Sequence, residues 1–414
     1  MFLSLLSPLN GANGANGANG ANGANGANGA NGANGANGAN GYAGLAGAIS
    51  NPLLVAGLIQ STGALAAASP DLFKLKPWVS SATLPAMDNH PSALIQRDPT
   101  TRFHLAMVEL LSGLDYDTTT AAHTAKVQLR VAGAANVDLL TLVRPSFAQF
   151  NRQLELVIRR SRLRPERTSE ILSQVTPQYA YWSGICGLHP DATPRTIEIT
   201  YIALHFVMMV CQRLKHALAC PRPHEYSPMM QPIILTPAYT AWPMGHATEA
   251  YMFTRIICAL SPTIEADAKP QLLKLARRIA DNRVVAGVHF PIDSPAGFVL
   301  ADVMADYFIA RCCGTKVAPA ELDGQKLNAE SDADPVTVFL DASGWNKNEP
   351  AEVAVLGKDG KATSDVDGEA IIGPKPTRIS QPAAKRGAPT NVPQSPLLHE
   401  MWKRAQTELV ANLF

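Results

Sequence analysis

The sequence IEITYIALHFVMMVCQRLKHALACPRP, residues 197–223, decides the fold that we expect. Its apolar residues recur three and four positions apart, which predicts an amphipathic helix over Ile197–Ala217. The most apolar part, Tyr201–Cys211, contains His205 and is far shorter than the roughly 20 apolar residues that cross a bilayer. We therefore expect a helix of a soluble protein with no membrane partner.

The same spacing continues on both sides of this helix, from Tyr42 to about Arg311. Proline and glycine separate the apolar segments, and few of them alternate in the way that strands do. The sequence therefore predicts an all-α fold, a helical bundle over residues 42–313. The other expected helices are Leu105–Leu114, Asn136–Leu142, Pro145–Arg160, Pro165–Gln174, His246–Leu260, Ala266–Arg283 and Ser294–Ile309.

Two polar regions flank the predicted bundle. Residues 1–41 contain ten Asn-Gly-Ala triplets and a final Asn-Gly, which cannot bury enough apolar surface to offset backbone entropy. We expect a flexible tract; a stacked glycine-rich structure or an assembly handle is the alternative. Residues 314–394 predict a loop-rich wrap with Asp-Gly turns at Asp323, Asp359 and Asp367, and with either extended chain or a hairpin from Val336–Leu340 and Val353–Leu356.

Residues 395–414 predict a C-terminal amphipathic helix, with Ser395 as its N-cap and Pro396 in its first turn. The helix can pack on its own bundle or on the partner of a homodimer. Its expected apolar face comprises Leu397, Leu398, Met401, Trp402, Leu409, Val410 and Leu413.

Composition narrows the function classes. The 414 residues include 35 Lys and Arg against 34 Asp and Glu, a net charge of +1, so no overall positive field attracts nucleic acid or an anionic membrane. Six cysteines without a CxxC pattern predict buried thiols, not a disulfide scaffold or a cysteine metal site. The N-terminus, MFLSLLSPLN, lacks the features of a signal peptide. We expect a cytoplasmic or non-classically exported protein.

Three short segments carry the residues that could do chemistry. They are KHALACPRP (215–223), WPMGHAT (242–248) and NRVVAGVHFPID (282–293). In the first, Lys215 lies near a helix end and Arg222 stands between two prolines that hold it extended. Both cations can point into one pocket, although basic residues near a helix C-terminus commonly serve the macrodipole and solvent.

The second segment predicts a helix start near His246. Its first N–H groups are free to bind an oxyanion, Gly245 lets the backbone approach a ligand, and His246 is placed for proton transfer. The plainer alternative is a capped helix with a surface histidine. Trp242, together with Tyr239 and Phe290, could line a halide pocket, but ordinary packing explains each of them as well.

In the third segment Arg283 closes a helix and a turn through Gly287 follows. His289 and Asp293 are expected four residues apart across the first turn of the next helix. The Asp293 carboxylate can then accept a proton from one imidazole nitrogen of His289 and leave the other as a metal ligand or nucleophile. An N-capping aspartate beside a packed histidine is the alternative.

The ordered pattern K-x6-RP, PxGH and R-x5-H-x3-D resembles the signature of the type 2 phosphatidic acid phosphatase superfamily, which includes vanadium-dependent haloperoxidases and bacterial acid phosphatases. The resemblance covers residues 215–293 and implies a helical bundle around a bound vanadate or phosphate. Met244 stands where the common PSGH form has serine, and Asn282 stands where the phosphatases usually have serine.

Carried over to this sequence, the resemblance implies that Lys215, Arg222 and Arg283 neutralise the oxyanion, with help from the Gly245 amide. His289 would be the axial vanadium ligand of a haloperoxidase or the phosphorylated nucleophile of a phosphatase. His246 would be the acid or base, and Asp293 would orient His289. Met244 would adjoin the oxyanion without the usual hydroxyl. The same resemblance suggests a homodimer or larger homo-oligomer.

The length and the absent export signal favour a vanadate-dependent haloperoxidase that converts hydrogen peroxide and halide to hypohalous acid, with a small organic acceptor. A soluble phosphatase on the same site is the second hypothesis. The third is an assembly protein with a vestigial site, built on the repeat tract and the C-terminal helix. The intact charged residues of all three segments argue against this last hypothesis.

Overall fold

The computed structural model describes residues 60, 91–119, 121–176, 178–327 and 384–413. The chain divides into two compact units, Met1–Arg102 and Phe103–Phe414. The described part of the first unit contains the 3-10 helix η4 (Pro91–Gln96) and the start of α5 (Pro99–Ser112). Asp98 caps this helix, because its Oδ1 accepts a hydrogen bond from Thr101 N at 3.0 Å.

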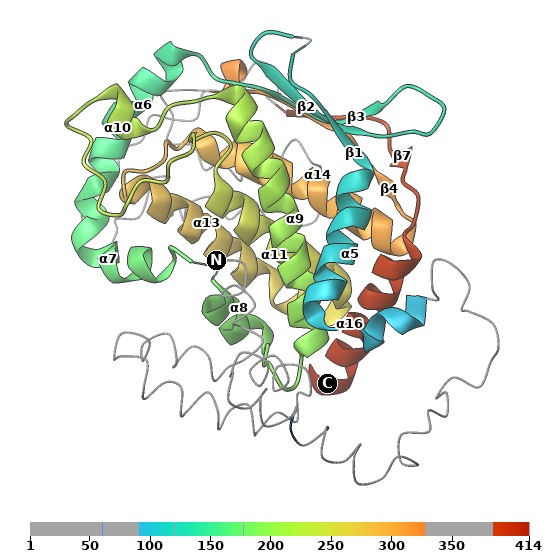
Figure 1. Ribbon diagram of the computed structural model, residues 1–414. Helices are drawn as coiled ribbons and strands as arrows, with labels where there is room; N and C mark the ends of the chain where they lie inside the picture. The colour runs from blue at the N-terminus through green and yellow to red at the C-terminus, as the bar shows by residue number, and fades with distance from the viewer. Residues whose placement is uncertain (1–59, 61–90, 120, 177, 328–383, 414) are drawn as a thin grey trace, which may run out of the picture. The chain divides into compact units, whose positions relative to one another are not determined.

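Four long helices form the core of the second unit (Figure 1). They are α9 (Pro194–Leu218), α11 (Gly245–Leu260), α13 (Lys269–Val285) and α14 (Asp293–Cys313). The central helix, α11, packs against the other three. Gly297 allows α14 to approach the start of α11, since a Cβ on this residue would lie 2.6 Å from Met244 O.

Shorter helices surround this core. They are α6 (Phe147–Arg160), η5 (Ser161–Leu163), α7 (Arg164–Ser173), α8 (Tyr179–Cys186), α10 (Pro223–Tyr226), α12 (Pro262–Asp267) and η6 (Gly324–Lys326). The capping box of α6 joins Ser146 and Gln149 in both directions. Apart from the segment Asn136–Leu142, the helices expected from the spacing of apolar residues are present, and the one expected over Ala266–Arg283 is divided into α12 and α13.

The expectation of an all-α fold is wrong. Helix accounts for 62% of the described residues, but the unit also contains two sheets, so the fold is mixed α/β. The larger sheet has the strand order β1-β2-β3-β5-β6 and the smaller one pairs β4 with β7. The strands are β1 (Leu114–Asp117), β2 (Thr124–Leu129), β3 (Val137–Val143), β4 (Lys316–Val317), β5 (Ala320–Asp323), β6 (Ala384–Arg386) and β7 (Thr390–Asn391).

The segment Asn136–Leu142, predicted as a helix, forms β3 instead. Leu139, Leu140 and Leu142 are fully buried in this strand. Leu140 stands opposite Val127 of the antiparallel neighbour β2, while β3 runs parallel to β5 on its other side. So short an apolar run is compatible with the residue spacing of a helix and with that of a strand. Pairing with strands that are distant in the sequence favours the strand.

The regions that flank the predicted bundle are described in part. Gly314 ends α14 in the left-handed conformation, with φ of 72°. The described parts of residues 314–394 then contribute β4 to β7, and Asp323 makes the expected turn, with its Oδ1 accepting from Gln325 N at 3.0 Å. Residues 1–41, the turns at Asp359 and Asp367 and the possible hairpin lie outside the described residues.

The C-terminal helix α16 (Pro396–Leu413) packs on α9 and α14 of its own chain. Ser395 is its N-cap, as predicted, since Ser395 Oγ accepts from Leu398 N at 3.3 Å. Glu408 in turn caps the start of α9 by accepting from Thr196 N at 2.7 Å. Val410 was expected on the buried face but is 63% exposed, because it lies about 100° around the helix from the buried Leu409.

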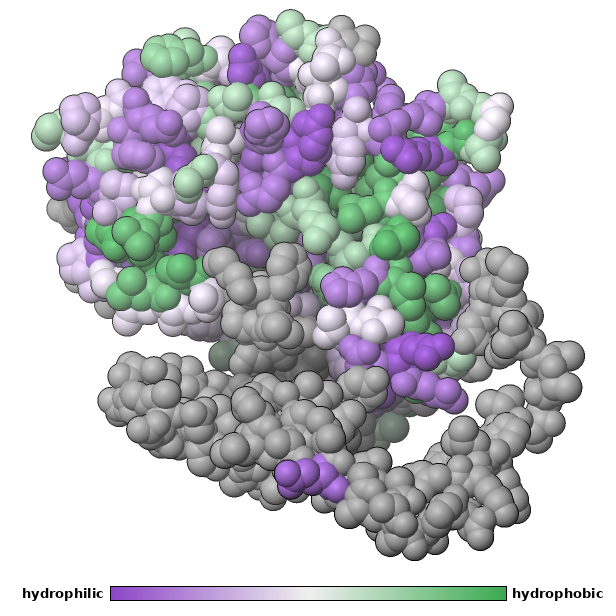
Figure 2. Space-filling view, viewed as in Figure 1, coloured by the Kyte–Doolittle hydropathy of each residue, from purple (hydrophilic) through white to green (hydrophobic). Residues whose placement is uncertain are grey.

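The segment Pro194–Tyr226 is long and apolar enough to cross a membrane, with a mean hydropathy of 1.3. However, 72% of the stretch that meets this criterion is buried inside the protein, where α9 contacts α11, α14 and α16. A buried core helix passes the same test, so the finding is weak support for a membrane span. Figure 2 shows hydrophilic and smaller hydrophobic areas interspersed over the described surface on this side.

Candidate functional site

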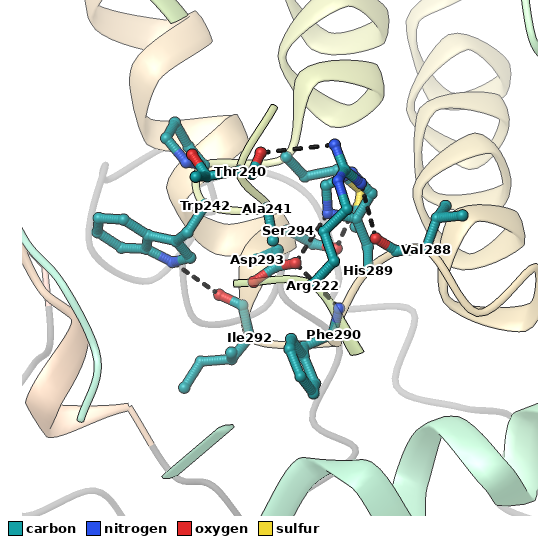
Figure 3. A network of polar contacts seen from close by, with 12 residues as sticks. Arg222, Thr240, Ala241, Trp242, Val288, His289, Phe290, Ile292, Asp293 and Ser294 are labelled. Carbon is teal, nitrogen blue, oxygen red and sulfur yellow. Dashed lines mark hydrogen bonds and ion pairs between the residues drawn. The ribbon is translucent and has the colours of Figure 1, made fainter. Parts of the chain in front are cut away.

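The three segments singled out in the sequence meet in the structure (Figure 3). Helix α9 ends at Leu218, and Arg222 is extended, with φ of −88° and ψ of 163°. Lys215 Nζ and Arg222 Nη2 both donate to Thr240 O, at 2.9 and 3.5 Å. The two cations thus share one buried site, as the sequence predicts. Burial lowers the pKa of both groups, and that of Lys215 falls to about 8.

His289 lies directly beside Arg222. The distance from Arg222 Nη1 to His289 Nε2 is 3.3 Å, and the same Nη1 donates to Val288 O at 2.8 Å. The imidazole is only 3% exposed. Burial, followed by the charges of Arg222 and Lys215, lowers the pKa of His289 well below its usual value. The ring is therefore neutral, with one protonated and one unprotonated nitrogen.

Asp293 decides which nitrogen of His289 carries the proton. Its Oδ2 accepts from His289 Nδ1 at 2.8 Å and from Phe290 N at 2.9 Å. The lone pair therefore remains on Nε2, the nitrogen that faces Arg222. Burial raises the pKa of Asp293 to about 7, against the hydrogen bond from Phe290 and the charges of Lys215 and Arg222.

One detail of the sequence interpretation is wrong at this point. His289 does not lie in the first turn of a helix, because α14 begins only at Asp293. Residues 290–293 form a turn that leads into the helix, in which Asp293 N donates to Phe290 O at 3.0 Å. The hydrogen bond predicted from the spacing of four residues nevertheless forms, since the turn directs both side chains inward.

Arg283 is the least satisfied cation of the site. Its side chain is fully buried, and only Nη2 is bonded, to Ile171 O at 2.8 Å. Its Nε and Nη1 atoms have no hydrogen-bond partner among the residues that the structure describes. Burial lowers the pKa of Arg283 to about 10, and the charges of Glu170 and Glu249 offset this only in part. Buried donors without acceptors are uncommon and costly, so Arg283 has two donor atoms that an added acceptor could satisfy.

The start of α11 adds backbone donors. The first bond within the helix joins Thr248 N to Met244 O at 3.1 Å, so the N–H groups of residues 245–247 precede it. Within the described ranges no acceptor is found for these three groups. A Cβ on Gly245 would lie 4.0 Å from Lys215 Cε, which places this backbone beside the buried ammonium. The helix terminus and the lysine together suit a bound anion.

Met244, at the N-cap of α11, does not cap the helix with its side chain. It is fully buried, and its sulfur accepts a weak hydrogen bond from Ser294 Oγ at 3.7 Å. The thioether therefore packs against the first turn of α14.

His246 follows on the first turn of α11 and is half-buried. Its Nε2 contacts Gln174 O at 3.1 Å. Since a carbonyl only accepts, Nε2 carries the proton and Nδ1 the lone pair. Burial, and then the charge of Arg283, lowers the pKa of His246 to about 3. The imidazole is thus an unprotonated base at neutral pH.

Sequence reasoning missed two members of the site, Gln174 and Glu249. Glu249 lies one turn after His246, and burial raises its pKa to about 7 against the charges of Arg283 and Lys215. Its spacing of three residues from His246 was the available signal. Gln174 contributes a backbone carbonyl, for which side-chain identity gives no signal.

The three aromatic residues considered for a halide pocket differ in their placement. Trp242 and Phe290 are fully buried; the indole of Trp242 donates to Ile292 O at 3.3 Å, and Phe290 packs on Phe150 with ring centroids 5.1 Å apart. Tyr239 is 42% exposed and lies against Lys215 and Arg222, at 5.4 and 5.1 Å from its ring. Of the three, only Tyr239 has a partly exposed ring beside the candidate site.

A scan of the sequence against models of known protein families finds no match, and a search of curated proteins finds none either. In the described part of the chain no group of three or more His, Cys, Asp or Glu residues could hold a metal ion. The site instead combines one imidazole nitrogen with three buried cations. This set fits an oxyanion with a single histidine bond, because the unpaired donors of Arg283 require acceptor oxygens.

Proposed function

We propose that the chain is a vanadate-dependent haloperoxidase, which uses hydrogen peroxide to oxidise a halide to hypohalous acid. One observation carries the proposal. Arg283 is fully buried with two unpaired donor atoms among the described residues, and its charge, like those of the buried Lys215 and Arg222, acts on His289. Three desolvated cations whose charges act on a neutral imidazole match a tetrahedral oxyanion in charge and in hydrogen-bonding capacity.

The residues divide the work by their chemistry. Lys215, Arg222 and Arg283 would bind the oxyanion oxygens, with the N–H of Gly245, and His289 Nε2 would supply the bond to vanadium. These residues would hold vanadate, which would supply Lewis-acid polarisation of peroxide for attack by halide. Hydrogen peroxide, halide and one proton then give hypohalous acid and water.

His246 and Asp293 would manage the protons. Asp293 keeps the proton of His289 on Nδ1 through the 2.8 Å contact and thereby keeps Nε2 available. The unprotonated Nδ1 of His246 can accept the proton of hydrogen peroxide. At neutral pH His246 carries no second proton, because burial and the charge of Arg283 lower its pKa, so the role of an acid that protonates a leaving group would first require it to bind one.

The second candidate is a soluble phosphatase, favoured by the same unprotonated Nε2 of His289. In that reaction Nε2 attacks phosphorus, the P–O bond of the ester breaks and the leaving oxygen takes up a proton; water then hydrolyses the phosphohistidine. The oxyanion contacts would be unchanged.

A paired assay tests the proposal. Purified full-length protein is incubated with orthovanadate, hydrogen peroxide and bromide, and bromination of phenol red is followed, while hydrolysis of para-nitrophenyl phosphate is measured in parallel. We expect bromination that requires vanadate, is inhibited by phosphate and is lost in His289→Ala. His205→Ala is the matched control, since His205 is a half-buried histidine of α9 whose Nδ1 bonds only to Tyr201 O, at 2.9 Å. Unchanged dye at every pH, with hydrolysis of the ester, would replace the haloperoxidase with the phosphatase.

A further inference from the structure

Two backbone carbonyls at the C-terminal end of α7 accept hydrogen bonds from Arg283 and His246, to which we assign a function. Ile171 O accepts from Arg283 Nη2 at 2.8 Å, and Gln174 O, just after the helix, accepts from His246 Nε2 at 3.1 Å. Carbonyl groups at the end of a helix have no partner within it and carry partial negative charge. Helix α7 therefore presents acceptors to the anion-binding arginine and to the candidate base together.

The direction of the Gln174 carbonyl is fixed by the side chain of the same residue. Gln174 is fully buried; its Oε1 accepts from Asn282 Nδ2 at 2.9 Å and its Nε2 donates to Glu170 Oε1 at 3.0 Å. Glu170 is bound by Arg278 Nη2 at 2.8 Å. The Gln174 side chain is thus bonded to Asn282 of α13, which directly precedes Arg283, and to Glu170 of α7.

The carbonyl of Gln174 selects one form of His246. If the bond to this carbonyl were lost, only the weaker backbone contact with Val175 would still act on the ring, and either ring nitrogen could carry the proton, because the two neutral forms of imidazole differ little in free energy. Only the form with the proton on Nε2 leaves Nδ1 as an acceptor. Gln178 Nε2 also donates to Gln174 O, at 3.0 Å, and so helps to hold the carbonyl in place.

We propose that Gln174 is a positioning residue, which holds His246 with its proton on Nε2 and joins it through Asn282 to the segment of Arg283. The predicted effect of Gln174 on turnover rests on the proposed function. The prediction that His246 is protonated on Nε2 does not depend on it. The phosphatases usually have serine in place of Asn282. The shorter serine side chain would not reach Gln174 Oε1, the partner of Asn282. Gln174 and Asn282 act as one unit in this account.

The protonated nitrogen can be measured without any activity. Full-length protein labelled with ¹⁵N-histidine is examined by NMR, and the signals of His246 are assigned by their absence in His246→Gln. We expect the pattern of a ring protonated on Nε2 in the wild type and averaged shifts in Gln174→Met. Gln149→Met is the matched control, because Gln149 is also buried and bonds carbonyls elsewhere, such as Gly324 O at 3.0 Å. Wild-type ¹⁵N shifts of His246 in Gln174→Met would overturn the proposal.

A second variant covers the case in which Gln174→Met fails to fold. Asn282→Ser removes the same hydrogen bond from α13 and should produce the same averaging. In the bromination assay both variants should lose about tenfold in kcat, the scale of a misplaced catalytic group, with KM for peroxide nearly unchanged. The double variant should lose no more than either single one. Additive losses would overturn the coupling of Gln174 with Asn282. If no variant or wild type brominates, while the NMR result holds, the proposed function fails and the positioning role stands.

Discussion

Replacement of Arg283 with methionine should stabilise the protein in anion-free buffer and abolish binding of the oxyanion. Arg283 is fully buried, and its Nε and Nη1 have no partner in the described residues. Two unsatisfied buried groups cost about 2–6 kcal/mol. The fall in the pKa of Arg283 from its ordinary value to about 10 corresponds to about 3 kcal/mol. The lost bond to Ile171 O offsets about 1–3 kcal/mol of this gain.

The net expectation is a free energy of unfolding that rises by about 1–3 kcal/mol, because an apolar side chain of similar volume often replaces a poorly paired buried charge at no cost. For a unit of this size the melting temperature should rise by roughly 2–6 °C. The dissociation constant for orthovanadate should increase about 10²- to 10⁴-fold, the loss of two charge-assisted hydrogen bonds. Thermal unfolding with and without orthovanadate measures both effects. A variant that is less stable than the wild type and still stabilised by vanadate would refute the reasoning.

Four further predictions follow from the same site. Burial lowers the pKa of Lys215 to about 8, so vanadate affinity should fall above pH 8, while the free energy of unfolding should rise between pH 8 and 10.5 because the unfolded chain binds the proton more tightly there. Titrations of wild type and Lys215→Met check this, and identical profiles would contradict it. Glu249, whose pKa is raised to about 7, should repel the oxyanion once it is ionised. Glu249→Gln should therefore tighten vanadate binding roughly three- to tenfold at pH 8.5 and hardly at pH 5.5. Equilibrium dialysis measures this difference. His246→Ala should retain vanadium, measured by elemental analysis, and lose about 10²- to 10⁴-fold in turnover; loss of the metal would indicate a structural role instead. Met244→Ser should tighten vanadate binding modestly through its hydroxyl and cost about 1–3 kcal/mol in stability, since the thioether is fully buried against Ser294; weaker binding would contradict the first part.

Local periodicity predicted the helices well, because α9, α11 and α14 each have apolar residues at helical spacing over many turns. It failed for Val137–Val143, which pairs in parallel with Ala320–Asp323, far along the chain. No local pattern reports such a pairing, and seven residues with five leucines or valines fit either a strand or a helix. The sheet therefore had to be seen in the structure.

Lys215, Arg222, Arg283 and Asp293 were singled out because they lie in three short motifs that occur in a set order along the chain, whereas Glu249 was missed. The hydrogen bond between His289 and Asp293 also followed from their spacing. The position of the proton on His246 could not be predicted, since it depends on a backbone carbonyl of Gln174. The unpaired donors of Arg283 likewise depend on which carbonyls and carboxylates the fold brings near, and the sequence does not contain that information.

The central claim is that the three segments enclose one oxyanion, bonded to a single imidazole nitrogen. An anomalous-scattering map of a crystal soaked in orthovanadate tests it directly. We expect one vanadium peak bonded to His289 Nε2, with vanadate oxygens within hydrogen-bond distance of Arg283 Nε and Nη1. A crystal that takes up vanadium elsewhere, or not at all, with both atoms of Arg283 still without acceptors, would contradict the account.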